Sequence, residues 1–154
     1  MPQTLQSPTL EDAIALAVEA HRGQTDKAGE PYVLHPLRVM LRLETQEERI
    51  VAVLHDVAED GAVGLERLRG LGFPDRIVEA LDALTRREGK ETYAEYIERL
   101  SGNRMARRVK LADLEDNMDV RRLARIGEVE AERLARYRES WGRLRRLESE
   151  ADRS

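Results

Sequence analysis

The sequence contains no cysteine among its 154 residues. This absence excludes disulfide bonds, catalytic thiols, and sites in which cysteine holds zinc or an iron–sulfur cluster. Histidine nitrogens and carboxylate oxygens are therefore the ligands that we expect at any metal site in this protein. The chain has only three histidines, so only three positions can supply an imidazole ligand.

Long apolar runs are also missing. No uninterrupted apolar segment approaches the roughly 20 residues of a membrane-spanning helix, and the N-terminus lacks both the basic and the apolar region of a signal peptide. We therefore predict a cytoplasmic protein that does not associate with a membrane.

A concentrated basic region, which nucleic-acid binding requires, is absent from most of the chain. The net charge is −4. Residues 1–120 contain 16 basic and 23 acidic side chains, and residues 121–154 contain 10 basic and 7 acidic ones. This distribution argues against a nucleic-acid partner and leaves a small molecule as the expected ligand.

Helical periodicity dominates the sequence, and we find no convincing strand, repeat or linker. Thr9 followed by Asp12 predicts a capped first helix, and the glycines and prolines of residues 23–36 predict a long loop after it. The sequence predicts an all-α fold, a compact helical bundle in one domain spanning residues 1–154. The expected helices cover residues 8–23, 37–44, 46–60, 65–72, 74–87, 92–100, 105–123 and 128–148.

Residues 55–60 place four ionisable side chains in a helix that is otherwise apolar. At 100° per residue, His55, Asp56, Glu59 and Asp60 fall within an arc of about 140°. The apolar side chains of residues 50–58 occupy the opposite arc. A solvated acidic face would give the same pattern, so this helix alone leaves a chemical and a structural interpretation open.

Two further segments offer groups of the same kind. Lys110, Asp113 and Asn117 follow the spacing i, i+3 and i+7, which places them on one stripe of a helix. His35 precedes Pro36, which favours a position at a helix entrance. Each segment alone is compatible with a structural role. Together with residues 55–60 they supply two imidazoles and two carboxylates, a set that suits six-coordinate Mn²⁺ or Fe²⁺ with water in the open positions.

These residues, in this order, match a known family. The pair His35-Pro36, the run HDVAED at 55–60, and KLAD at 110–113 with Asn117 resemble the HD-domain phosphohydrolases. The resemblance is specifically to the hydrolase domain of the RelA/SpoT enzymes and to their single-domain relatives, the small alarmone hydrolases. It covers about residues 10–123 and leaves residues 124–154 as an arginine-rich C-terminal helix packed on the bundle.

The resemblance implies a reaction and a division of roles. The family removes pyrophosphate from the 3′ position of guanosine tetra- and pentaphosphate and leaves the 5′ di- or triphosphate. Glu59 and Asp60 align with the acidic pair that positions and deprotonates the attacking water, and Asn117 aligns with an amide on the substrate side. The metal is usually Mn²⁺, with Fe²⁺, Co²⁺ and Zn²⁺ as alternatives. Its implied ligands are His35, His55, Asp56 and Asp113.

Further substrate contacts are expected around this centre. Lys27, in the flexible loop, would neutralise a diphosphate group as a point charge. Tyr32 would line the pocket or, equally, anchor the loop against the core, and we include Lys110 among the expected substrate contacts. Arg133 and Tyr137 lie one turn apart, a spacing that resembles phosphate contacts in the single-domain relatives, although an ordinary amphipathic helix would show it too.

The sequence departs from the family in the expected pocket wall. Asp26 stands where these hydrolases usually have an arginine associated with the base, and a carboxylate cannot stack on a purine as a guanidinium can. The family's DRLHN is DLEDN here, at residues 113–117, while Gly61 and Val120 replace hydroxyl residues.

These departures leave two alternatives to a guanosine pyrophosphohydrolase. The first is a nucleotide phosphatase acting on an adenosine alarmone, NADPH or a nucleoside monophosphate. The second is a nucleotide-binding module without turnover. The intact Glu59–Asp60 pair argues against the second alternative, because a binding module has no need of a group that activates water.

Overall fold

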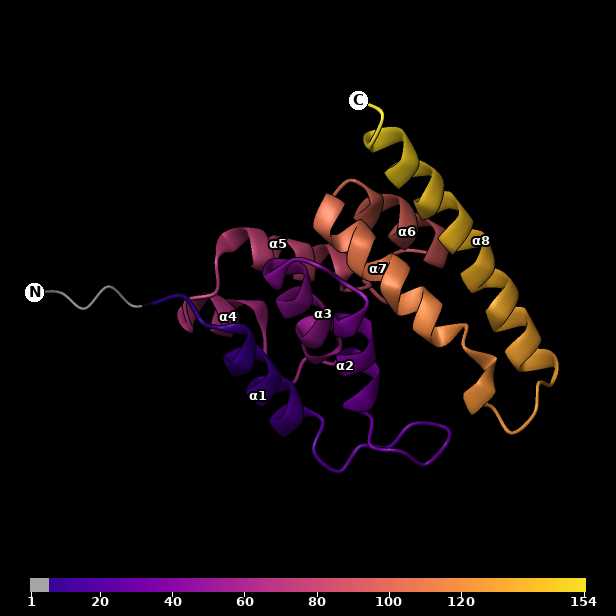
Figure 1. The fold of residues 1–154 in the computed structure, drawn as a ribbon, viewed down its shortest axis with the longest axis horizontal. Helices are drawn as coiled ribbons and strands as arrows, with labels where there is room; N and C mark the ends of the chain where they lie inside the picture. Colours follow the sequence, from indigo (N-terminus) through magenta and orange to yellow (C-terminus); the bar gives the residue numbers. More distant parts are fainter. Residues whose placement is uncertain (1–5) are drawn as a thin grey trace, which may run out of the picture.

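The computed structural model describes residues 6–154 and, within them, contains helices but no named strand (Figure 1). This result confirms the predicted all-α fold. The elements are α1 (Leu10–Ala20), α2 (Leu34–Leu41), α3 (Gln46–Glu59), α4 (Leu65–Gly70), α5 (Asp75–Leu84), α6 (Tyr93–Ser101), α7 (Arg104–Asn117), the short 3₁₀ helix η1 (Val120–Arg122) and α8 (Glu128–Ala151).

Local capping signals explain where several helices begin. Thr9 and Asp12 form a reciprocal capping box at the start of α1. The Thr45 hydroxyl accepts the Glu48 backbone N–H at the start of α3. These side chains satisfy donors that the first turn of a helix leaves free. The predicted starts of these two helices are therefore correct to within two residues.

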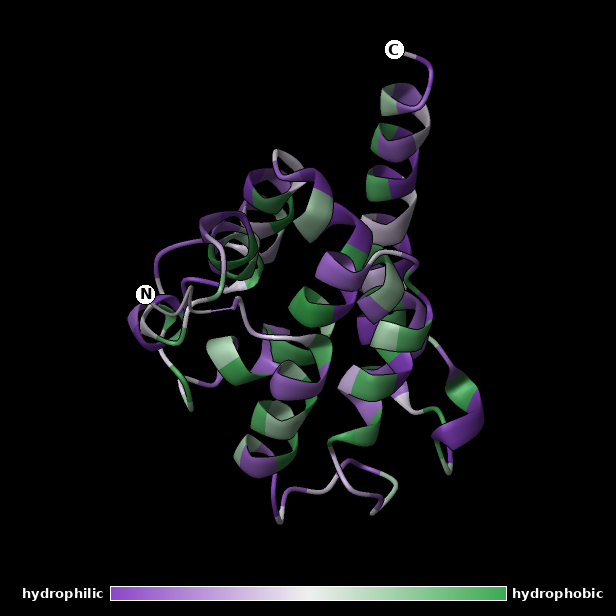
Figure 2. Ribbon diagram, turned by 60° about the vertical axis from the view of Figure 1, so that its left-hand side comes forward, coloured by the Kyte–Doolittle hydropathy of each residue, from purple (hydrophilic) through white to green (hydrophobic). Residues whose placement is uncertain are grey.

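Helix α3 is the centre of the bundle and packs against α1, α2, α5 and α7. Every residue from position 50 to position 58 is buried, including His55 and Asp56. The outer helices are amphipathic, and Figure 2 shows hydrophobic and hydrophilic residues alternating along the same ribbons. Burial of the polar residues of α3 therefore comes from the helices packed around it.

Helix α8 lies alongside α7 and contacts α6 at one side of the bundle (Figure 1). Its Leu144 is fully buried in an apolar cluster with residues of α6 and α7. Two arginines of α7 and two glutamates, from α3 and α8, form ion pairs beside this cluster. We call this group the anchoring network, and its members are Glu48, Arg107, Arg108 and Glu148.

The segment predicted as one helix over residues 105–123 is interrupted. Helix α7 ends at Asn117, and after a break the chain forms η1, where the Asp119 side chain accepts the Arg121 backbone N–H. An aspartate that bonds to nearby backbone competes with helix propagation, which explains the break. His35 lies within the first turn of α2, where the missing N–H of Pro36 breaks no helical hydrogen bond.

Across residues 6–154, no helix combines the length and the apolar character needed to cross a membrane.

Candidate functional site

Three helices bring the four predicted metal ligands together in the interior. His35 comes from α2, His55 and Asp56 from α3, and Asp113 from α7. All four residues are buried, with exposed fractions between 4% and 9%. Because α2 and α7 both pack against α3 and against each other, side chains 78 residues apart in sequence become neighbours. We call these four residues the histidine–carboxylate cluster.

The nitrogen and oxygen atoms of this cluster point toward one another. His35 Nε2 lies 3.0 Å from Asp113 Oδ1 and 3.6 Å from Asp56 Oδ2. His55 Nε2 lies 3.3 Å from Asp56 Oδ1 and 3.5 Å from Asp113 Oδ1. Donors on one ion are about 3 Å apart when they sit at right angles around a metal about 2.1 Å away. The spacing therefore fits a shared metal ion, and one donor atom each from His35, His55 and Asp56 lie within 4.8 Å of one another.

A hydrogen bond fixes the orientation of the His55 imidazole. His55 Nδ1 donates to the Ala52 carbonyl, one turn back in α3. Within residues 6–154 the buried His55 Nε2 has no hydrogen-bond partner. A buried polar atom without a partner is costly. A metal ion bound to Nε2 would remove that cost. The unpartnered nitrogen therefore supports a metal site independently of the sequence motif.

The electrostatics of the cluster favour added positive charge. Burial lowers the pKa of His55, but the carboxylates of Asp56 and Asp113 raise it to about 10. Burial also lowers the pKa of His35, yet its hydrogen bonds to Asp113 and Asp116 raise it overall. The imidazoles therefore attract protons because the site is rich in carboxylate charge. A divalent cation can supply that positive charge instead, with the imidazoles neutral as ligands.

Glu59 and Asp60 lie where α3 ends, one turn beyond the histidine and aspartate of the cluster. Both side chains are exposed, in contrast to the buried residues before them. Partial desolvation raises the pKa of the Glu59 carboxyl, and desolvation together with the charge of Asp56 raises that of Asp60. A raised pKa makes a carboxylate a better proton acceptor. The structure thus separates a buried group of ligands from an exposed acidic pair on the same helix.

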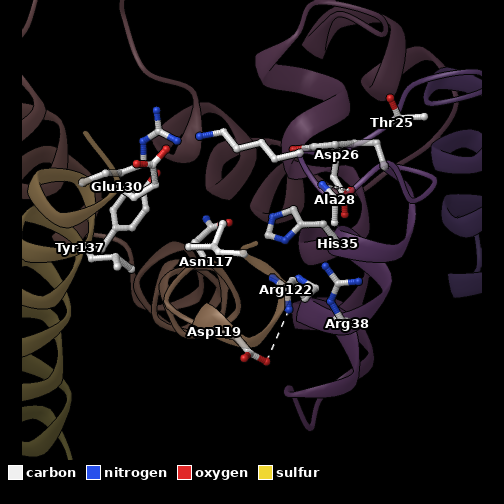
Figure 3. Close-up of a pocket in the computed structure, with 15 residues that line it drawn as sticks. Thr25, Asp26, Ala28, His35, Arg38, Asn117, Asp119, Arg122, Glu130 and Tyr137 are labelled. Atoms are coloured by element: carbon white, nitrogen blue, oxygen red, sulfur yellow. Dashed lines mark hydrogen bonds and ion pairs between the residues drawn. The ribbon is translucent and has the colours of Figure 1, made fainter. Parts of the chain in front are cut away.

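A cavity of about 310 Å³ adjoins the cluster, and His35 lines it (Figure 3). Figure 3 shows Glu130 and Tyr137 of α8 on one side, Asn117 of α7 in the middle, and Asp26, Ala28 and His35 on the other side. Five of the six expected substrate contacts line the cavity: Lys27, Tyr32, Asn117, Arg133 and Tyr137. The loop before α2 and the first half of α8 therefore face each other across one space.

Two of these side chains also contact the cluster. Tyr32 Oη donates to Asp56 Oδ2 at 2.8 Å, so Tyr32 both lines the cavity and braces a predicted ligand. Asn117 Nδ2 donates to Asp113 Oδ1 at 3.1 Å. Lys110, the sixth expected contact, lies outside the cavity. Its Nζ is 2.8 Å from Asp113 Oδ2 and sits over the Tyr96 ring, 5.4 Å from the centroid.

Asp26 sits on the cavity wall and organises the loop. Its Oδ1 accepts the backbone N–H groups of Ala28, at 2.9 Å, and Glu30, at 3.0 Å. An aspartate that accepts backbone N–H groups two to four residues ahead stabilises a turn. The residue that departs from the family pattern thus has a structural role as well as a position facing the cavity.

Sequence reasoning missed three residues beside the cluster: Arg38, Asp116 and Arg122. Arg38 and Arg122 line the cavity, and the fully buried Asp116 contacts both of them and His35. A signal was present, because Asp116 lies three residues after Asp113 within the segment that departs from the family. The pairing with α2, however, depends on how the helices pack, which periodicity does not report.

The sequence is similar to segments of longer proteins. No family model matches the sequence. Over 99 residues the chain is 37% identical to the bifunctional (p)ppGpp synthase/hydrolase SpoT of Escherichia coli. This match covers 58% of this chain and 14% of that protein. The chain is 31% identical over 120 residues to a guanosine-3′,5′-bis(diphosphate) 3′-pyrophosphohydrolase of Aquifex aeolicus, covering 71% of this chain and 17% of that protein.

A solved structure shares the fold. It is described as a metazoan ortholog of SpoT that hydrolyses ppGpp, and it superposes with a TM-score of 0.73. The match covers 94% of this chain and 86% of that one at 21% sequence identity. The chain spans less than a fifth of the length of the two curated relatives named above. The sequence similarity makes the chain a homologue of the SpoT/RelA hydrolase domain, and the solved structure shows that the two chains share a fold.

Proposed function

We propose that this protein is a metal-dependent pyrophosphohydrolase that removes the 3′-pyrophosphate of guanosine tetra- and pentaphosphate and leaves the 5′ di- or triphosphate. The observation that carries this proposal is that His35 belongs to two features at once. It is a member of the buried histidine–carboxylate cluster, and it lines the cavity next to that cluster. A nucleotide in the cavity would therefore have a phosphate group beside the cluster.

We assign His35, His55, Asp56 and Asp113 as the residues that would hold the metal, and Mn²⁺ as the ion. Nitrogen and oxygen ligands in a set of two imidazoles and two carboxylates suit Mn²⁺ and Fe²⁺. When bound, the ion would polarise a phosphoryl oxygen and lower the pKa of water. The His55 Nε2 atom without a partner supports this assignment.

The acidic pair takes the proton in this scheme. Water attacks the phosphorus bonded to O3′ and the P–O3′ bond breaks, which releases pyrophosphate and leaves O3′ to take up a proton as the 3′-hydroxyl. Glu59 or Asp60 accepts the proton of the water, and a raised pKa favours each carboxyl in that role. Their place at the exposed end of α3 allows proton exchange with solvent without displacement of the buried ligands.

The cavity wall supplies the contacts for a polyanion. Lys27 lies on the loop and Arg133 on α8, so the phosphate groups would meet cations from opposite sides of the cavity. Tyr137, also on α8, offers a hydroxyl, and Asn117, in the middle of the cavity, offers an amide. These assignments, and the nucleotide as the ligand, follow from the chemistry of the side chains and from the similarity to the SpoT relatives.

The decisive experiment uses metal-stripped protein reloaded with Mn²⁺. Products from guanosine and adenosine nucleotides with 3′-pyrophosphate, and from NADPH, are followed by phosphorus NMR. The His55→Ala variant tests the cluster, and Glu115→Gln, at an exposed position of α7, is the control. We expect pyrophosphate from the guanosine substrates with the wild type and control, and none with His55→Ala.

Other products would contradict the proposal in defined ways. Orthophosphate alone would establish a phosphatase, and a faster adenosine substrate would assign a different base. Binding of the nucleotides without any product would establish a binding module.

A further inference from the structure

Asp116 is a fully buried carboxylate to which the proposed reaction gives no role. It lies in the last turn of α7 and has an exposed fraction of 0%. Its Oδ2 accepts a hydrogen bond from His35 Nδ1 at 2.7 Å. A carboxylate in the interior is costly unless charged partners surround it. The question is why this position holds a charge at all.

Two arginines donate hydrogen bonds to Asp116, and the guanidinium of a third, Arg42, lies 3.8 Å from Oδ1. Arg38 Nε donates to Oδ1 at 2.9 Å, and Arg38 Nη2 donates to Oδ2 at 3.1 Å. Arg122 Nη2 donates to Oδ2 at 3.3 Å and to the Asp116 carbonyl at 2.8 Å. Both arginines line the cavity, as does His35. One carboxylate thus contacts three residues of the cavity wall, drawn from α2 and from η1.

The contact with His35 sets the direction of the imidazole. Once Nδ1 donates to Asp116, Nε2 is the nitrogen directed at Asp113, 3.0 Å away, and at Asp56. Histidines that hold metals usually donate the other ring N–H to a carboxylate or carbonyl, which fixes the tautomer and raises ligand basicity. His55 follows the same pattern with the Ala52 carbonyl as its acceptor.

We infer that Asp116 is a positioning residue that fixes His35 as a metal ligand and holds Arg38 and Arg122 on the cavity wall. The inference rests on the metal site of the proposed function. Asp116 would join metal binding to substrate binding, because the same carboxylate orients a ligand of the metal and two cations beside the substrate. A purely structural carboxylate would need the arginines alone, as Glu148 does in the anchoring network.

Two substitutions separate these roles. Asp116→Ala removes every contact, whereas Asp116→Asn retains a carbonyl oxygen that accepts the N–H of His35 and loses the charge that holds the arginines. Glu115→Gln is the matched control, because it removes one charge from the neighbouring, exposed position and keeps an oxygen for the indole N–H of Trp141. Mn²⁺ affinity is measured by calorimetry without nucleotide, and thermal unfolding of the metal-free proteins reports the fold.

We expect Asp116→Ala to weaken Mn²⁺ binding about 10- to 100-fold while the metal-free protein remains folded. Asp116→Asn should keep Mn²⁺ affinity within about threefold of wild type and raise KM for guanosine tetraphosphate about 3- to 10-fold, because the arginines lose a charged acceptor. Glu115→Gln should change neither quantity. This split between metal affinity and KM is a result that a structural role alone would not produce.

The opposite results would overturn the inference. Wild-type Mn²⁺ affinity in a folded Asp116→Ala variant would show that His35 needs no fixing, and absence of Mn²⁺ binding by the wild type would remove its basis. If Asp116→Ala does not fold, the variants Asp116→Asn and Arg38→Gln still test the role of Asp116. Arg38→Gln should raise KM and leave metal affinity unchanged, and a loss of metal affinity as large as that expected for Asp116→Ala would contradict the assignment. Calorimetry requires no turnover. A protein that binds Mn²⁺ but hydrolyses no nucleotide would therefore contradict the proposed function and leave the inference on Asp116 standing.

Discussion

The anchoring network and the histidine–carboxylate cluster are both polar groups between α3 and α7 whose carboxylates are buried, yet their charges are balanced differently. In the anchoring network each glutamate contacts an arginine: Glu48 pairs with Arg108, and Glu148 with Arg107 and Arg108, at 2.6–3.0 Å. Burial would raise the pKa of Glu148, but the hydrogen bonds from the two arginines lower it overall. This network is complete without any additional ion.

The cluster, in contrast, has a fixed cation for only part of its carboxylate charge. Lys110 pairs with Asp113, but Asp56 has no lysine or arginine partner within the described chain. Its nearest groups are the Tyr32 hydroxyl and the two imidazoles. Burial of charge alone therefore does not mark a functional site. Such a site is marked instead by a carboxylate without a fixed cation beside an imidazole nitrogen that, within residues 6–154, has no hydrogen-bond partner.

The largest effect should follow from removal of the carboxylate that lacks a cation. We expect Asp56→Asn to lower kcat/KM for guanosine tetraphosphate at least about 1000-fold, since loss of the metal forfeits several kcal/mol of transition-state stabilisation. The metal-free variant should unfold within a few degrees of wild type, because the imidazoles that face Asp56 can release a proton when its charge is lost, and because asparagine keeps an acceptor for Tyr32. Turnover assays and calorimetric melting measure the two quantities.

The melting result tests the comparison itself. A large drop in the unfolding temperature of metal-free Asp56→Asn would mean that Asp56 stabilises the fold as the anchoring network does. The distinction between the two regions would then fail.

Addition of Mn²⁺ should stabilise the wild type by mass action. At about 100 times the dissociation constant, the gain is about 2.7 kcal/mol, which corresponds to a rise of roughly 5–11 °C in the unfolding temperature of a chain of this size. Asp56→Asn should show no such rise, and Glu148→Gln should show all of it. Differential scanning fluorimetry with Mn²⁺ and with a chelator checks this, and an equal shift in all three proteins would locate metal binding elsewhere.

Substitution in the anchoring network should lower stability and leave metal binding unchanged, the reverse of the result expected for Asp56. We expect Glu148→Gln to destabilise the metal-free protein by about 2 kcal/mol, because two half-buried arginines lose their charged acceptor. Mn²⁺ affinity should remain at the wild-type value. Urea unfolding measures the first quantity and calorimetry the second. A tenfold loss of Mn²⁺ affinity would show that the network and the cluster are coupled through α7.

Much of the fold could be predicted from the sequence because its signals are local. The cap residues Thr9 and Thr45 and the apolar stripe of α3 each act within one or two turns, and the structure has helices there. The break after Asn117 could not be predicted from periodicity, since it arises from a side chain of the loop that bonds to backbone.

The site was less accessible to the same reasoning. Spacing could place His55 and Asp56 on one turn, but only the packing of α2 and α7 on α3 brings His35 and Asp113 to them. The family resemblance supplied that link. The role of Asp116 had no such help, because its partners come from two other elements and their contact distances depend on the tertiary fold.

Asp26 should give the smallest effect, because it contributes only one partly exposed charge to the cavity. Asp26→Asn keeps an oxygen for the Ala28 and Glu30 N–H groups, so the turn should persist. Loss of a negative charge near a bound polyanion should lower KM for guanosine tetraphosphate about two- to fivefold, within the range of an exposed charge interaction, and leave kcat unchanged.

Steady-state kinetics measure this change, with Glu30→Gln as the control on the exposed part of the same loop. The control should leave KM within about twofold of wild type, since exposed charges outside the cavity are screened by salt. If Asp26→Asn instead raised KM while Glu30→Gln did not, the carboxylate would bind the substrate, for example by accepting N–H groups of the base. In that case the residue that departs from the family would select the base rather than repel the phosphates.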